Sequence, residues 1–198
     1  MPRRRDDDAQ RARLSEAVFT TLAERGPSGF TLRAVAETAG CTTGLVLHTF
    51  ADRRALLLHA RDVLHARTRE RSDDLERRAP DAASAVRAIV LEALPSSPAT
   101  LAEARVWTGF LAASLSDPVL AARQATDSSA FADRLGRLLQ AVSDSSDDDA
   151  RARASALAAM VEGVSSLAAG DPDGWPADRQ RAAVSVVLDA ALGGPQGR

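Results

Sequence analysis

Residues 31–50 carry the pattern that most constrains the fold, that of two short helices separated by a turn. The first helix would place apolar residues on one face, at Leu32, Val35, Ala36 and Ala39. Thr31 can cap the start of this helix, and Gly40 follows its last apolar residue, where glycine commonly ends a helix. Thr42 or Thr43 can then cap a second helix. The pattern predicts a helix-turn-helix, whose second helix can enter the DNA major groove, although any small helical hairpin could show it.

Length and composition exclude several classes of protein. The 198 residues suffice for one domain or two small ones with a sizeable core. No uninterrupted apolar run reaches the roughly 18 residues of a transmembrane helix, and no secretory signal is present, so we expect a cytoplasmic protein with no membrane partner. The single cysteine, Cys41, excludes an intramolecular disulfide framework and fits a small core residue better than a redox sensor.

The charge is unevenly distributed along the chain. Residues 1–78 contain 15 Arg and 12 Asp or Glu, whereas residues 79–198 contain 10 Arg and 15 acidic residues. The net charge of −2 therefore hides an N-terminal part that is basic and a C-terminal part that is acidic. This asymmetry suits contact with DNA at one end of the chain only.

Helical periodicity and turn residues continue through the whole chain, which predicts an all-α fold. Residues 9–25 form one helix that ends at a Gly-Pro-Ser-Gly break, and residues 53–78 form a long, charged connector helix. An acidic loop is expected at residues 143–149, and further helices at residues 82–94, 100–115, 118–142, 150–169 and 176–192. We therefore expect a DNA-binding domain at residues 9–52, joined by the connector to a C-terminal ligand-binding and dimerisation domain at residues 79–198.

The segment FTLRAVAETAG-CTTGLVLHTF-ADRRALL, residues 30–57, resembles the TetR family of transcriptional regulators. The C-terminal half resembles its BetI-like branch, at residues 104–122 and 160–192. The resemblance implies a homodimer that binds a double-stranded operator of pseudo-twofold symmetry and usually represses. It also implies that a small molecule entering the C-terminal domain releases the DNA, and it implies no cofactor.

The resemblance also assigns contacts with DNA. Residues expected near bases or adjoining phosphates are Arg33, Thr43, Gly44, Leu45 and Leu47; those expected at the DNA backbone are His48, Thr49 and Arg53; Thr42 is either a contact or a helix cap. Arg33 could read a guanine, or could pair with Glu37 one helical turn away. Arg53 stands at a helix N-terminus, where phosphate binds favourably. Thr49 departs from the aromatic residue or histidine usual there, which weakens one expected phosphate contact.

Two further sites are expected in the C-terminal half. Large apolar side chains opposed by alanine predict an effector pocket at Ile89, Trp107, Phe110, Leu111 and Phe131, with ordinary core packing as the alternative. Residues 100–115 are apolar on nearly every side, which predicts a central, buried helix. The last two helices are expected to form a dimer interface at Met160, Gly163, Val164, Leu167, Val184, Val187, Leu188 and Ala191, with packing inside one chain as the alternative.

Catalytic and metal sites are not expected. No nucleophile stands with a plausible base, and no phosphate-binding loop is present. The three histidines, at positions 48, 59 and 65, lack the spacing of zinc ligands. A ligand-responsive repressor is therefore preferred over two alternatives, a helical adaptor with weakened DNA contact and an all-α enzyme.

Overall fold

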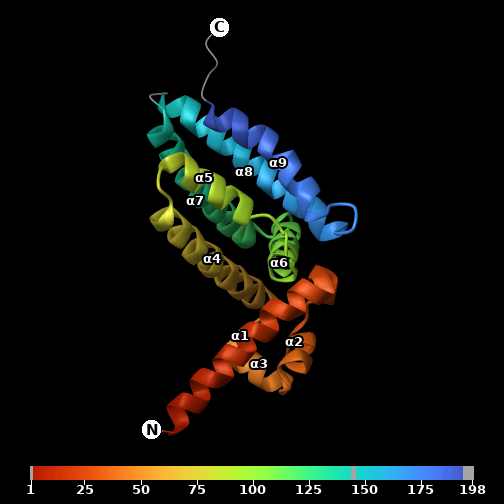
Figure 1. The fold of residues 1–198 in the computed structure, drawn as a ribbon. Coiled ribbons are helices and arrows are strands. Elements are labelled where there is room, and N and C mark those ends of the chain that lie inside the picture. Colours follow the sequence, from red (N-terminus) through yellow and green to blue (C-terminus); the bar gives the residue numbers. More distant parts are fainter. Residues whose placement is uncertain (1, 144–145, 194–198) are drawn as a thin grey trace. The chain divides into compact units, whose positions relative to one another are not determined.

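The computed structural model describes residues 2–143 and 146–193, and every regular element in those ranges is a helix (Figure 1). This confirms the all-α class. The helices are α1 (Pro2–Gly29), α2 (Leu32–Ala39), α3 (Thr43–Thr49), α4 (Arg53–Arg78), α5 (Ala82–Glu92), α6 (Pro98–Ser114), α7 (Pro118–Val142), α8 (Asp147–Gly170) and α9 (Ala177–Leu192). Within the described ranges, none of these helices is long and apolar enough to cross a bilayer.

The expected first helix is longer than its periodicity indicated. It begins at Pro2 instead of near residue 9, and it is interrupted at Gly26, which has a non-helical backbone with φ 61° and ψ −178°. Glycine tolerates this positive φ, and Pro27 then suits the first position of a new helical turn. The break predicted from the Gly-Pro-Ser-Gly sequence is therefore a kink, followed by one more turn that ends at Gly29.

The expected acidic loop is also shorter than predicted. Residues 147–149 form the first turn of α8, and the Ser146 side chain caps it by accepting a hydrogen bond from the Asp149 N–H. Carboxylates are favourable in a first turn because the amide dipoles of the helix point their positive end there. Residues 144 and 145 of the predicted loop lie outside the described ranges.

The chain divides into two compact units that interleave along the sequence. The first unit contains residues 1–66 and 102–123, so most of α6 and the start of α7 share it with α1 to α3 and the first part of α4. The second unit contains residues 67–101 and 124–198, and within it α8 and α9 lie side by side (Figure 1).

Each unit has its own apolar core. The first core includes Leu22, Phe30, Val46, Leu56, Leu57 and Phe110. The second core includes Ile89, Leu94, Leu135, Leu139, Leu157 and Leu188. The expectation of a helix buried on all sides at residues 100–115 is wrong, because Arg105 is exposed and Leu115 is 84% exposed. One side of α6 packs into the first core, through Val106 and Phe110.

Candidate nucleic-acid interface

Short-range hydrogen bonds set the geometry of α2, the turn and α3. The Thr31 hydroxyl accepts from the Ala34 N–H at 3.1 Å and begins α2. Gly40 ends it in the left-handed conformation, with φ 63° and ψ 38°. The Gly40 and Cys41 N–H groups donate back to the carbonyls of Glu37 and Ala36, an arrangement that satisfies the end of α2. These bonds confirm the predicted helix-turn-helix and hold Cys41 partly buried against the first core.

The helix α3 presents most of its surface to solvent. Of its seven residues only Val46 is fully buried, and Leu45 packs partly against the first core. The exposed residues are Thr43, Gly44, Leu47, His48 and Thr49. Leu47 is 48% exposed, so about half of this apolar residue remains accessible from outside the unit. Of the candidate residues expected to contact DNA from this helix, all but Leu45 are therefore exposed, and Thr43, Gly44, Leu47 and His48 share one face of the helix.

Gly44 adds to this picture because no residue in the described part of the chain crowds this position. A Cβ atom at this position would meet only the Thr42 hydroxyl, at 3.8 Å, which is ordinary contact. Glycine inside a helix costs roughly 0.5–1 kcal/mol relative to alanine. The absence of a side chain thus leaves room for close approach from outside the protein.

The structure separates the roles of the threonines. The Thr42 side chain caps α3 by accepting from the Leu45 N–H at 3.3 Å, whereas Thr43 is exposed on the first helical turn. The Thr49 hydroxyl donates to the Leu45 carbonyl at 3.3 Å, within its own helix. Thr43 is therefore the threonine whose side chain is not already used by these helix bonds.

Arg33 is exposed on α2 and does not form the pair with Glu37 that was the alternative to a DNA contact. The Glu37 carboxylate instead accepts from Arg25 of α1, at 3.0 Å. Within the residues that the structure describes, Arg33 forms no ion pair with a carboxylate. Its charge remains available to an external anion or base edge.

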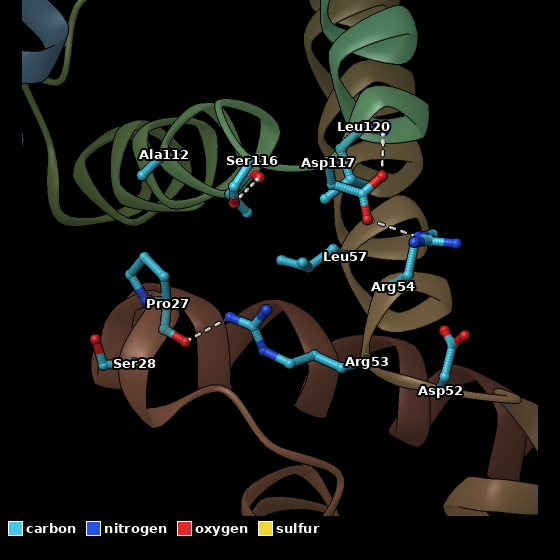
Figure 2. A pocket seen from close by; sticks show the side chains of 11 residues that line it. Pro27, Ser28, Asp52, Arg53, Arg54, Leu57, Ala112, Ser116, Asp117 and Leu120 are labelled. Atoms are coloured by element: carbon cyan, nitrogen blue, oxygen red, sulfur yellow. Dashed lines mark hydrogen bonds and ion pairs between the residues drawn. The ribbon is translucent and has the colours of Figure 1, made fainter.

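Arg53 has a structural role that sequence reasoning missed. Its Nε donates to the Phe30 carbonyl at 3.0 Å and one terminal nitrogen, Nη2, donates to the Pro27 carbonyl at 2.7 Å (Figure 2). The guanidinium therefore ties the start of α4 to the end of α1 and the segment after it. No local pattern announces these bonds, because the partners lie 23 and 26 residues away in the sequence.

Four of the five residues expected around an effector pocket divide between the two cores. Phe110 is fully buried and Trp107 partly buried in the first unit. Ile89 is buried and Phe131 packs partly in the second unit, while Leu111 is half-buried on α6. An open pocket in the first unit is lined by other residues, near Arg53 (Figure 2).

The residues expected at a dimer interface also divide into two sets. Four are buried in the core of their own chain, namely Val164, Val184, Leu188 and Ala191. Met160 and Val187 are partly exposed, and Gly163 and Leu167 are exposed. Sequence reasoning missed Val186, which is 73% exposed on α9. The signal for it was present as a second apolar spacing on that helix, Ala182, Val186 and Ala190.

Comparison with known proteins identifies the family. Residues 82–193, more than half of the chain, match the family described as BetI-type transcriptional repressor, C-terminal. The chain belongs to the TetR family. Residues 14–60 match the family described as bacterial regulatory proteins, tetR family. The matched range contains the second half of α1, all of α2 and α3, and the start of α4. These two family matches make the protein a transcriptional regulator and not an enzyme.

Individual TetR-family relatives cover most of the chain. The regulator BetI of Stenotrophomonas maltophilia is 33% identical over 173 residues, 83% of each protein. A transcriptional regulator from Rhodococcus sp. RHA1 has a similar structure, with a TM-score of 0.84 and 28% identity over 92% of this chain and 96% of that one. A regulator from Saccharomonospora viridis, solved in complex with choline, shares the fold at a TM-score of 0.81 with 18% identity, over 92% and 96% of the chains.

His59 gives this unit a pH-dependent stability. Its Nε2 lies 2.8 Å from the Ser15 hydroxyl, and its ring packs against Phe50. Burial lowers the pKa of His59 below its ordinary value of 6.5, and the nearby Asp62 carboxylate opposes this only in part. As the pH falls below 6.5, the unfolded chain therefore takes up the proton before the folded one, and stability is lost.

We expect the melting temperature to fall between about pH 7.5 and about pH 5.5, and to fall less in His59→Gln. The exposed His48→Gln is the matched control and should keep the wild-type dependence. If the melting temperature fell by the same amount in wild type and in His59→Gln across this pH range, the assignment to His59 would be contradicted.

Proposed function

We propose that this protein binds a double-stranded operator as a homodimer, through α2 and α3, and that a small molecule controls this binding. The observation that carries the proposal is the surface of α3, which anchors itself in the core through Val46 and leaves five residues exposed. A seven-residue helix is about 10 Å long, which suits a major groove about 12 Å wide. Arg33 on the adjoining helix adds a charge with no ion-pair partner in the described ranges.

The homodimer is supported by the outer surfaces of α8 and α9. On α8 the exposed residues include Ala152, Ala156, Ala159, Gly163 and Leu167, and on α9 they include Ala182, Val186 and Ala190. Leu167 and Val186 are 50% and 73% exposed, an arrangement that a second copy would cover. Small residues beside them allow two helix pairs to approach closely. A twofold dimer would present two copies of α3, which matches a palindromic operator.

Control by a ligand is supported by an unsatisfied polar group in the second unit. The Gln124 amide N–H donates to the Ser128 hydroxyl at 2.9 Å, and this hydroxyl donates to the Glu162 carboxylate at 3.2 Å. The Gln124 amide oxygen is buried without a hydrogen-bond partner in the described ranges. A buried acceptor of this kind costs about 1–3 kcal/mol, which a donor on a ligand would recover. We propose that the effector binds in the second unit, at Gln124, and disfavours the DNA-bound dimer.

The test of DNA recognition is selection of bound sequences from random DNA, followed by titration of the selected operator. Arg33→Ala is expected to lose about 1–3 kcal/mol of specific binding and to relax one base position in each half-site. Arg105→Ala removes an exposed arginine from α6 of the same unit and should leave both quantities unchanged. If wild type enriches no sequence and its DNA binding does not weaken with salt, the adaptor alternative replaces the proposal.

A further inference from the structure

The first unit contains an open pocket of about 660 Å³, a volume typical of small-molecule sites. The end of α1 and the first turns of α4 form one part of its wall, and the end of α6 with the start of α7 forms the other (Figure 2). All of its lining residues belong to the first unit, the one that contains α2 and α3. It is therefore separate from the second unit, where Gln124 lies.

The two arginines of the pocket differ in how their charge is balanced. The Arg54 Nε donates to the Asp117 carboxylate at 2.7 Å. Burial raises the pKa of the Asp117 carboxyl, but the hydrogen bond from Arg54 and those from two backbone N–H groups outweigh it, so this pKa lies below its ordinary value. The Arg54 charge is thus neutralised by an ionised partner, at one edge of the pocket (Figure 2).

The Arg53 charge meets only neutral groups. Its guanidinium lies between Pro27 and Leu57, and its two hydrogen bonds go to backbone carbonyls (Figure 2). The remaining terminal nitrogen, Nη1, has no hydrogen-bond partner in the part of the chain that the structure describes. The carbonyls hold the guanidinium in place without cancelling its charge, so the pocket contains a positioned donor for an anion.

The remaining wall limits the kind of anion. The accessible apolar side chains beside the guanidinium are Pro27, Ala112 and Ala113, whereas Leu57 and Leu120 are almost fully buried behind the surface of the pocket. An ion without apolar surface, such as inorganic phosphate, would leave these groups uncovered. Asp52 and Asp117 also line the pocket, and their charge disfavours a dianion. Arg54 pairs with Asp117, and Asp52 accepts from the Ala55 N–H, so Arg53 is the pocket cation that has no ion pair in the described ranges. Its guanidinium beside accessible apolar side chains matches one negative charge on a small organic body.

We propose that this pocket binds a small organic monocarboxylate, with its carboxylate on Arg53 Nη1 and its apolar body against Pro27, Ala112 and Ala113. This site is distinct from the effector site proposed above and does not depend on it. A carboxylate bound here would hold the Arg53 guanidinium in its inward position. Where the regulator uses Arg53 to bind the DNA backbone, as the family resemblance implies, the carboxylate and the operator compete; this part of the proposal rests on the proposed function.

The test uses 1-naphthoate as the probe and 1-naphthamide as its uncharged counterpart, titrated into the full-length protein by calorimetry without DNA. We expect saturable binding of one naphthoate per chain, with naphthamide at least about tenfold weaker because it lacks the charge. Ala112→Phe places a ring from an exposed position of α6 into the pocket and should abolish binding. Ala121→Phe adds the same ring at an exposed position of α7 outside the pocket and should leave binding unchanged.

Arg53→Gln should weaken naphthoate binding at least about tenfold, with a melting curve recorded to establish that the variant is folded. Binding that survives Ala112→Phe would overturn the site, and equal affinity for naphthamide would overturn the anion. No saturable binding to wild type would overturn both. In a second experiment, naphthoate is expected to weaken binding of the selected operator to wild type but not to Ala112→Phe. Equal weakening in both proteins would overturn the proposed competition with DNA. The titration without DNA decides separately whether the site exists.

Discussion

Phe110→Ala is expected to destabilise the protein by about 3–5 kcal/mol, the range for truncating a buried phenylalanine. The ring is fully buried in the first core, and the buried Arg61 guanidinium lies 5.7 Å from its centre. The substitution removes apolar contacts, leaves a cavity, and deprives the Arg61 cation of an aromatic face. Since domains of this kind are stable by only about 5–15 kcal/mol, a large fraction of the variant should be unfolded or aggregated on expression at 37 °C.

Urea unfolding followed by circular dichroism measures this effect. Leu115→Ala is the matched control, because Leu115 is on the adjoining turn but 84% exposed, and should change stability by no more than about 0.5 kcal/mol. The same pair separates the two interpretations of Phe110. A loss below about 1 kcal/mol, with the response to an inducer abolished, would make Phe110 a pocket wall and contradict its role in the core.

Val186→Arg is expected to convert the proposed homodimer into monomers at micromolar concentration. Val186 is 73% exposed on α9, so an arginine there need not disturb the core of its own chain. At a twofold interface each substitution appears twice. The two new arginines would place like charges in the interface formed by α8 and α9, where they repel each other. Because a monomer contacts one half-site, operator affinity should fall at least about 100-fold, which corresponds to about 2.7 kcal/mol.

Light scattering gives the mass, and titration of the selected operator gives the affinity. Val119→Arg is the matched control, since it adds the same side chain at a position of α7 that is 48% exposed in the first unit. That variant should remain dimeric. A monomeric wild type at micromolar concentration would show that the homodimer proposal is wrong. A dimeric Val186→Arg would place the interface elsewhere.

The choice of buried faces shows the limit of reasoning from sequence. Residues 100–115 are apolar on nearly every side, so periodicity alone assigns no direction to the helix. Only packing in the first unit buried Phe110 and left Leu115 exposed. The same holds for α9, which carries two apolar spacings. The structure uses Val184 and Leu188 for its own core and leaves Val186 outside.

The helix-turn-helix and the bounds of α4 could be predicted from the sequence because their causes are local. Thr31 and Thr42 cap helices three residues ahead, and Gly40 ends α2 through bonds that reach back at most five residues. Such bonds depend on residue type and spacing, which the sequence contains. The family resemblance rests on the same stretch, and the comparisons confirmed it.

The partners of the charged side chains depended on the tertiary structure. Arg33 lies one turn from Glu37, yet Glu37 bonds to Arg25, twelve residues away. Arg53 looked like a free cation at a helix start, yet two of its nitrogens bond to carbonyls 23 and 26 residues away. Arginine reaches many acceptors of similar chemistry, so its partner is decided by which acceptor the packed backbone brings within about 3 Å. The sequence by itself determined the all-α class, the helix-turn-helix and the family, and only the packing of α1 against α2 and α4 decided which arginines remain free to bind.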